Sequence, residues 1–108
     1  MPEETPAPGR KSPPVRLLYA EDCESNVMLF ELYLKHTSFI MESAENGLQA
    51  VEKFKAGAFD LVIMDLQMPV MDGAEAIRAI RRHEAANGLE RTPVIAITLL
   101  LVAAERGL

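Results

Sequence analysis

The chain has 108 residues, enough for one small domain with a single core. Its formal net charge of −5 excludes the basic surface that direct nucleic-acid binding requires, and its single cysteine excludes an internal disulfide. No apolar stretch reaches the roughly 18 residues needed to span a bilayer. These properties predict an acidic, soluble, cytoplasmic domain that binds neither nucleic acid nor a membrane directly.

Residues 1–14 differ in composition from everything that follows. They contain five of the seven prolines, and Met1 is their only large apolar residue. Such a segment cannot bury enough apolar surface to offset the entropy lost on ordering. We therefore expect a disordered, proline-rich leader at 1–14 and one folded domain at 15–108.

From Val15 onward, strand-like segments alternate with helical ones. Four segments have strand length, and three show apolar residues at helical spacing. This alternation predicts an α/β fold with a doubly wound parallel sheet. The predicted strands are Val15–Ala20, Phe39–Ser43, Asp60–Asp65 and Val94–Ile97, and the predicted helices run from Glu24 or Ser25 to Lys35, from Asn46-Gly47 to Gly57, and from Gly73 to about Ala86.

Three of these segments carry predictions about burial. The first helix is apolar over a wide arc that includes Met28 and Phe30, which predicts burial on more than one side. The run Leu61–Met64 fits a strand buried on both faces of a sheet. The charged segment 81–84 lies near the end of the third helix, and we expect this helix end to face solvent.

Polar residues follow three of the predicted strands: Glu21-Asp22, Asp65 and Thr98. The ends of parallel strands share one edge of the sheet, where α/β proteins place their chemistry. Crowded carboxylates repel one another unless a cation neutralises them, and an all-oxygen site suits Mg²⁺. An aspartate nucleophile, a hydroxyl and Mg²⁺ together predict phosphoryl transfer onto Asp65.

Helix capping is the alternative role for two of these residues. Taken alone, Asp22 could cap the first helix and Thr98 could cap a helix that follows the last strand. The occurrence of polar residues at three strand ends favours a shared site over separate caps.

The motifs around these residues resemble the receiver domain of two-component response regulators. They are LLYAED at 17–22, DLVIMDLQMPVMDG at 60–73 and PVIAIT at 93–98, with weaker support from Asn26 and from AENGLQA at 44–50. The resemblance implies a flavodoxin-like fold with strand order 2-1-3-4. It also implies a signalling module that is not an enzyme, apart from self-catalysed phosphoryl transfer and dephosphorylation.

The same resemblance implies a role for each residue of the predicted site. Asp65 accepts a phosphoryl group from a phosphohistidine of a sensor kinase or a histidine phosphotransfer protein. Asp22 and Asp65 bind Mg²⁺ directly, the backbone carbonyl of Gln67 is a further ligand, and Glu21 contributes through water. Thr98 contacts the phosphoryl group and begins the conformational switch.

The chain also departs from the family pattern. Receivers continue with a fifth strand that ends in a phosphate-pairing lysine and with a fifth helix, whereas this chain ends at Leu108. Lys53 and Lys55 cannot replace that lysine, because both lie on the second predicted helix. Leu99 follows Thr98 where most receivers have a small residue. We therefore expect a C-terminally truncated receiver.

These departures leave two other functions open. One is a pseudo-receiver, an interaction module that works without phosphorylation and that could form a homodimer or a domain swap through surface exposed by the truncation. The other is a phosphohydrolase that uses an aspartyl-phosphate intermediate. That class normally has a second aspartate two residues after the nucleophile, and Gln67 stands there, so we rank it last.

Overall fold

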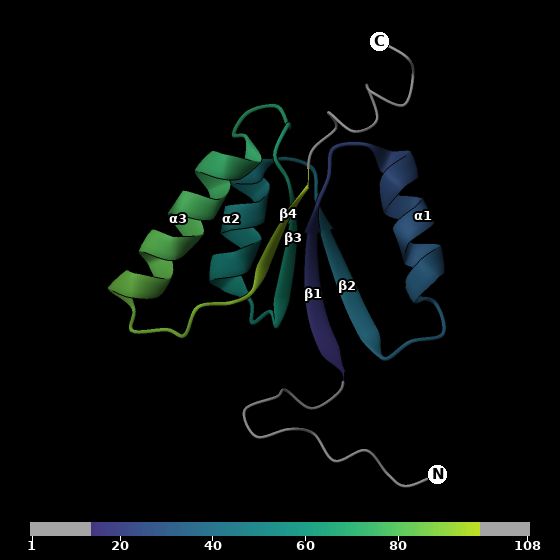
Figure 1. Cartoon of the computed structure of the whole chain (residues 1–108), viewed down its shortest axis with the longest axis horizontal. Helices are drawn as coiled ribbons and strands as arrows, with labels where there is room; N and C mark the ends of the chain where they lie inside the picture. Colours follow the sequence, from purple (N-terminus) through teal and green to yellow (C-terminus); the bar gives the residue numbers. More distant parts are fainter. Residues whose placement is uncertain (1–13, 98–108) are drawn as a thin grey trace, which may run out of the picture.

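The computed structural model describes residues 14–97, which form a four-stranded parallel sheet between two layers of helices (Figure 1). The strand order is β2-β1-β3-β4; α1 covers one face of the sheet, and α2 and α3 cover the other. The predicted doubly wound sheet and its order are confirmed. The elements are β1 (Val15–Ala20), α1 (Glu24–Leu34), β2 (Phe39–Ala44), α2 (Gly47–Ala56), β3 (Leu61–Asp65), α3 (Gly73–Ala86) and β4 (Val94–Ile97).

The register of the strands brings the predicted site residues to one edge. Ala20 at the end of β1 pairs with Met64 of β3, and Asp65 at the end of β3 pairs with Ile97 at the end of β4. The acids after β1 and at the end of β3 therefore lie at the carboxyl edge of neighbouring strands. Thr98 lies outside the described residues, as do residues 1–13, so the predictions for Thr98 and for the leader stay predictions.

The face beneath α2 and α3 holds the continuous core. The second and third helices begin at side-chain caps, Asn46 and Asp72, which accept hydrogen bonds from the backbone of Gln49 and Glu75. Their apolar sides close over alternate residues of the strands. The cluster consists of Leu18, Ala20, Ala44, Ala50, Val51, Phe54, Phe59, Val62, Met64, Met68, Ala76 and Ile80.

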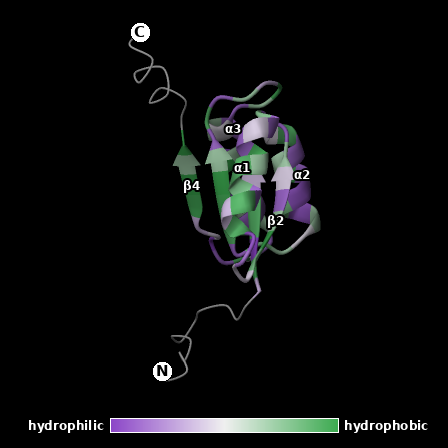
Figure 2. Cartoon of the chain, turned by 90° about the vertical axis from the view of Figure 1, so that its right-hand side faces the viewer, coloured by the Kyte–Doolittle hydropathy of each residue, from purple (hydrophilic) through white to green (hydrophobic). Residues whose placement is uncertain are grey.

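The face beneath α1 is thinner. Among the described residues α1 buries none of its side chains, so the prediction that this helix is buried on more than one side is wrong there. Leu61 and Ile63 of β3 are only half-buried, so the prediction that this strand is buried on both faces is also wrong. The physical reason is that a single helix covers this face in residues 14–97. Figure 2 shows β4 as a hydrophobic edge strand beside α1, not beneath it.

The end of α3 is exposed at Arg82, Ala85 and Ala86, as the sequence suggested, but the expectation is wrong for Glu84. Glu84 is 2% exposed and accepts hydrogen bonds from Arg81 Nη1 at 2.8 Å and from the Thr92 N–H at 2.7 Å. Arg81 also donates to the Thr92 carbonyl at 2.9 Å. This network ties α3 to the segment that leads into β4. No helix within residues 14–97 is both long and apolar enough to cross a membrane.

Candidate functional site

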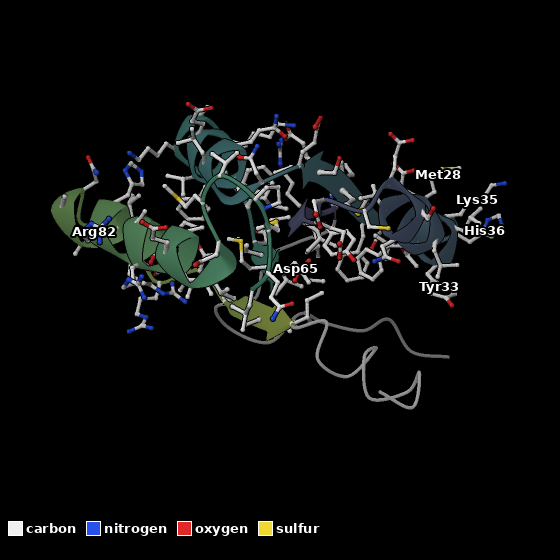
Figure 3. All side chains as sticks on the ribbon, turned by 90° about the horizontal axis from the view of Figure 1, so that it is seen from above. Met28, Tyr33, Lys35, His36, Asp65 and Arg82 are labelled. Atoms are coloured by element: carbon white, nitrogen blue, oxygen red, sulfur yellow. The ribbon has the colours of Figure 1, made fainter. Side chains whose placement is uncertain are left out.

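Three carboxylates meet at the carboxyl edge of the sheet. Glu21 and Asp22 follow β1, and Asp65 is the last residue of β3. One oxygen from each lies within 4.8 Å of the others, which is close enough for a single cation to contact all three. Seen from above this edge, Asp65 lies between the two helical layers (Figure 3). The structure thus brings together three of the residues that the sequence predicted to share a site.

Asp65 is fully buried, and only one of its carboxylate oxygens is paired. Its Oδ1 accepts a hydrogen bond from the Gln67 N–H at 3.0 Å, while its Oδ2 has no hydrogen-bond partner among residues 14–97. A buried carboxylate oxygen without a partner is costly. The Asp65 Oδ2 atom is therefore available to bind a cation or to form a bond to phosphorus. The neighbouring acids supply the hard oxygen ligands that Mg²⁺ prefers. The residues present therefore fit a magnesium ion.

Glu21 is 3% exposed and is held at both oxygens. Its Oε1 accepts from the Tyr19 hydroxyl and its Oε2 accepts from the Cys23 N–H, each at 3.2 Å. Burial and the nearby Asp65 carboxylate raise the pKa of Glu21 against the lowering effect of these hydrogen bonds. A bound cation would lower this pKa, because its positive charge would stabilise the ionised carboxylate.

Asp22, in contrast, is exposed. It does not cap the first helix: the N-cap of α1 is Cys23, and no side chain caps that helix end. The capping alternative for Asp22 is therefore wrong. A hollow of about 230 Å³ opens beside Glu21 and Asp22, lined further by Glu24, Val27, Ser43 and Glu45. Its charged residues are all acidic, so the hollow favours a cation over an anion.

The loop after Asp65 is shaped by close backbone contacts that the sequence did not reveal. A Cβ on Gly73 would lie 2.2 Å from the Asp65 carbonyl oxygen, and a Cβ on Gly47 would lie 2.1 Å from the Met71 carbonyl oxygen. The Gly47 N–H also donates to Met71 at 2.9 Å. Asn46-Gly47 predicted only a turn into a helix, because sequence alone does not show that α2 begins against this loop.

Val70 adds strain to the same loop. Its φ is 70°, and the Met71 N–H donates to the Pro69 carbonyl at 2.8 Å across it. This is the γ-turn with positive φ, a rare and strained conformation, and a β-branched residue is poorly suited to it. Backbone strain of this kind gathers at functional sites.

The remaining predicted residues have mixed outcomes. Gln67 is exposed, and its N–H holds Asp65; whether its carbonyl binds a metal remains a prediction. Lys53 lies on α2, and its Nζ contacts β2, where it donates to the Ser43 carbonyl at 2.6 Å and lies 3.8 Å from Glu42.

The sequence is similar to known signalling proteins. The family model for the response regulator receiver domain matches residues 17–105. Hybrid signal transduction histidine kinase B of Dictyostelium discoideum is 44% identical over 91 residues, which cover 84% of this chain and 5% of that protein. Response regulator sskA of Aspergillus fumigatus is 44% identical over 77 residues, which cover 71% of this chain and 9% of that protein. The chain thus spans a small part of these relatives.

Solved structures give the same result. The receiver domain of Ssk1 from Saccharomyces cerevisiae, solved in complex with the histidine phosphotransfer protein Ypd1, matches with a TM-score of 0.70 and 33% identity over 82% of this chain and 65% of that chain. The receiver domain of sensor histidine kinase PA1611 from Pseudomonas aeruginosa was solved with magnesium in its active site cleft. It matches with a TM-score of 0.72 and 30% identity, over 86% of this chain and 74% of that chain. Because the family model extends over most of the chain and both receivers share its fold, the chain belongs to the response regulator receiver domains of two-component and phosphorelay signalling.

Proposed function

We propose that Asp65 is the phosphoacceptor of this receiver and takes its phosphoryl group from a phosphohistidine. The observation that carries this proposal is the buried Asp65 carboxylate, whose Oδ2 lacks a partner among the described residues while two further acids lie beside it. A merely structural acid in that position would be paired, as Glu84 is. Membership of the receiver family supports the same role.

Mg²⁺ is the proposed cofactor. Asp22 and Asp65 would bind it directly, the carbonyl of Gln67 would be the third protein ligand, and Glu21 would act through a water molecule. When bound, it would neutralise the crowded carboxylates and the negative charge of the phosphoryl group. The fit of the three acids to one cation and the magnesium in the PA1611 receiver support this assignment.

In the proposed reaction a carboxylate oxygen of Asp65 attacks phosphorus. The new P–O bond forms as the P–N bond to the donor imidazole breaks, and the electron pair of the broken bond returns to that imidazole. The Gln67 N–H holds the Asp65 carboxylate in place through its 3.0 Å hydrogen bond. We propose that Thr98, which follows the Asp65 partner Ile97 in the chain, contacts the transferred group and starts the switch.

The proposed partner is a histidine phosphotransfer protein or a sensor histidine kinase, met in the cytoplasm. The complex of the Ssk1 receiver with Ypd1 supports the first of these. Apolar side chains of α1 are exposed in the described structure: Met28 is 60% exposed, Leu32 65% and Tyr33 69%. Figure 3 shows Met28 and Tyr33 on the side of α1 away from Asp65. Such a surface suits docking of a helical partner. We assign the chain no enzyme activity beyond its own phosphorylation and dephosphorylation, and no direct contact with nucleic acid.

The test is phosphorylation of the purified chain by acetyl phosphate with Mg²⁺, followed by intact-mass measurement. We expect a gain of about 80 Da, the mass of one phosphoryl group. The gain disappears in Asp65→Asn and on removal of Mg²⁺ with a chelator, and it persists in the matched control Asp60→Asn. A wild-type chain that never gains this mass, with Mg²⁺ and excess donor present, would refute the proposal.

A second candidate function is docking without phosphorylation, through α1 or through self-association. The exposed apolar residues of α1 favour it. It predicts partner binding, or dimerisation in sedimentation experiments, that is unchanged by Asp65→Asn and by chelation of Mg²⁺. Loss of binding in that variant would instead favour phosphorylation-dependent signalling.

A further inference from the structure

Tyr19 contacts the acidic site from within the sheet. Among residues 14–97, it is the only side chain that donates a hydrogen bond to one of the three site carboxylates; the other donors, Cys23 and Gln67, use their backbone N–H groups. The Tyr19 hydroxyl lies 3.2 Å from Glu21 Oε1. Tyr19 and Glu21 are two residues apart on β1 and its extension, so both point to the α1 face of the sheet.

The ring of Tyr19 has a fixed place. It is 7% exposed and packs against Phe30 of α1, with ring centroids 4.8 Å apart and planes inclined by 51°. Aromatic pairs at such spacing and tilt attract each other beyond the gain from burial. The hydroxyl is therefore delivered to Glu21 from a rigid support.

We propose that Tyr19 is a positioning residue for the cation site. Its hydroxyl fixes the rotation of the Glu21 carboxylate, so that this acid faces the place between Asp22 and Asp65 where a hydrated Mg²⁺ would sit. The inference rests on the proposed function, because it assigns Tyr19 a part in the magnesium site. Tyr19 lies within the motif LLYAED, but the sequence alone did not indicate that its hydroxyl contacts the site.

If Tyr19 had a purely structural role, Tyr19→Phe would leave the Mg²⁺ affinity unchanged. Phenylalanine at position 19 would fill the same space and keep the contact with Phe30, so packing would survive. The Cys23 N–H would still hold Glu21 Oε2, but Oε1 would lose its only donor among the described residues. The carboxylate would then be free to rotate about one remaining hydrogen bond. Loss of a partner that orients a metal-binding group typically weakens metal affinity by about 10–100-fold.

Calorimetric titration with Mg²⁺ tests this directly, with Tyr19→Phe compared with the matched control Tyr33→Phe on the exposed side of α1. We expect the dissociation constant to rise about tenfold in Tyr19→Phe, the lower end of that range, because Glu21 acts through water. Tyr33→Phe keeps the wild-type value. The Mg²⁺ concentration that half-saturates phosphorylation by acetyl phosphate should rise by the same factor, while the rate at saturating Mg²⁺ stays unchanged.

A second measurement leaves Tyr19 in place and so does not depend on how Tyr19→Phe folds. The chain has two tyrosines and no tryptophan, so in Tyr33→Phe the tyrosine emission comes from Tyr19 alone. We expect Mg²⁺ to change this emission with the midpoint found by calorimetry. The emission of Tyr33 in Tyr19→Phe should not respond.

The outcomes separate this inference from the proposed function. Unchanged Mg²⁺ affinity in Tyr19→Phe, with binding lost in Asp65→Asn, would overturn the role of Tyr19 and leave the phosphoacceptor site standing. The role of Tyr19 would also be overturned if calorimetry shows Mg²⁺ binding and the Tyr19 emission does not change. A wild-type chain that binds no Mg²⁺ in either measurement would overturn the inference together with the proposed cofactor.

Discussion

Two buried acids lie at opposite ends of the sheet, and their surroundings differ. Glu84, beside the segment that enters β4, is paired with Arg81 and with the Thr92 backbone. Asp65, at the carboxyl edge, has one oxygen bonded to the Gln67 N–H and one without a partner in residues 14–97. The nearest charges also differ, since Glu84 faces an arginine and Asp65 faces Glu21 and Asp22.

The difference separates an acid that supports the fold from one that is available for chemistry. At the Glu84 end, each buried charge is compensated, so the network stabilises the folded state. At the Asp65 end, unpaired oxygen, like charges and the strained Val70 all cost stability. Such costs are expected where a protein keeps a site ready for a ligand.

Glu84→Ala should have the largest effect. It leaves the Thr92 N–H and Arg81 without their buried acceptor, and loss of one partner of a buried pair costs about 3 kcal/mol. Urea unfolding measures the loss. Glu52→Ala, on the exposed side of α2, is the control and should change stability by less than about 0.5 kcal/mol. A small change in the free energy of unfolding for Glu84→Ala would show that Glu84 does not stabilise the fold, which would contradict the contrast with Asp65.

Asp65→Asn should act in the opposite direction. The amide removes one negative charge from the cluster, can donate a hydrogen bond to Glu21 and still accepts from the Gln67 N–H. We expect the metal-free variant to gain about 1–2 kcal/mol in the free energy of unfolding. Added Mg²⁺ should raise the unfolding temperature of the wild type and not of the variant. Destabilisation by Asp65→Asn would show that the carboxylate is structural.

Val70→Gly should give a smaller gain. Val70 is 76% exposed, so little packing is lost, and glycine accepts a positive φ without the Cβ clash. Relief of strain, less the greater chain entropy of glycine in the unfolded state, leaves about 1 kcal/mol. Val70→Ala keeps the Cβ and serves as the control with a lesser gain. Thermal unfolding of the wild type, Val70→Gly and Val70→Ala measures the two gains in stability. Equal stabilities of all three would mean that this loop stores no strain.

The smallest expected effect is a difference in how stability depends on pH, between Glu84 and Glu21 of the acidic site. Burial opposes ionisation of Glu84, but the hydrogen bonds from Thr92 and Arg81 and the arginine charge outweigh it and place its pKa below the ordinary 4.5. Its contribution to stability is therefore full above pH 4.5 and is lost as the pH falls through the lowered pKa. Glu84→Gln should remove this loss at low pH, as measured by urea unfolding at a series of pH values.

Glu21 behaves in the opposite way, because burial and Asp65 raise its pKa above the ordinary 4.5. Without metal, the folded state loses stability as the pH rises from 4.5 through the raised pKa. Urea unfolding at a series of pH values should show this loss in the wild type but not in Glu21→Gln, and Mg²⁺ should diminish it. A pH profile that Glu21→Gln leaves unchanged would contradict the assignment.

The sequence predicted most of the fold because its signals are local. Alternating strand and helix patterns gave every described element to within a residue or two. The convergence of Glu21, Asp22 and Asp65 followed from the geometry of parallel strands, since all carboxyl ends meet at one edge. Burial was harder to predict: Glu84 sits in a charged segment, and only the approach of Thr92 from another element makes it a core residue.

The sequence by itself determined the family resemblance, which in turn implied the strand order, and it determined the acids that share the site, because motifs and strand ends depend on residue type and spacing along the chain. Only the tertiary structure decided that Asp65 keeps an unpaired oxygen, that Glu84 is compensated and that Tyr19 reaches Glu21. It also revealed the close approach of Gly47 and Gly73 to the loop after Asp65. Some of these contacts join segments that are distant in sequence, and others depend on the rotamer that each side chain adopts. Packing of the whole domain fixes both.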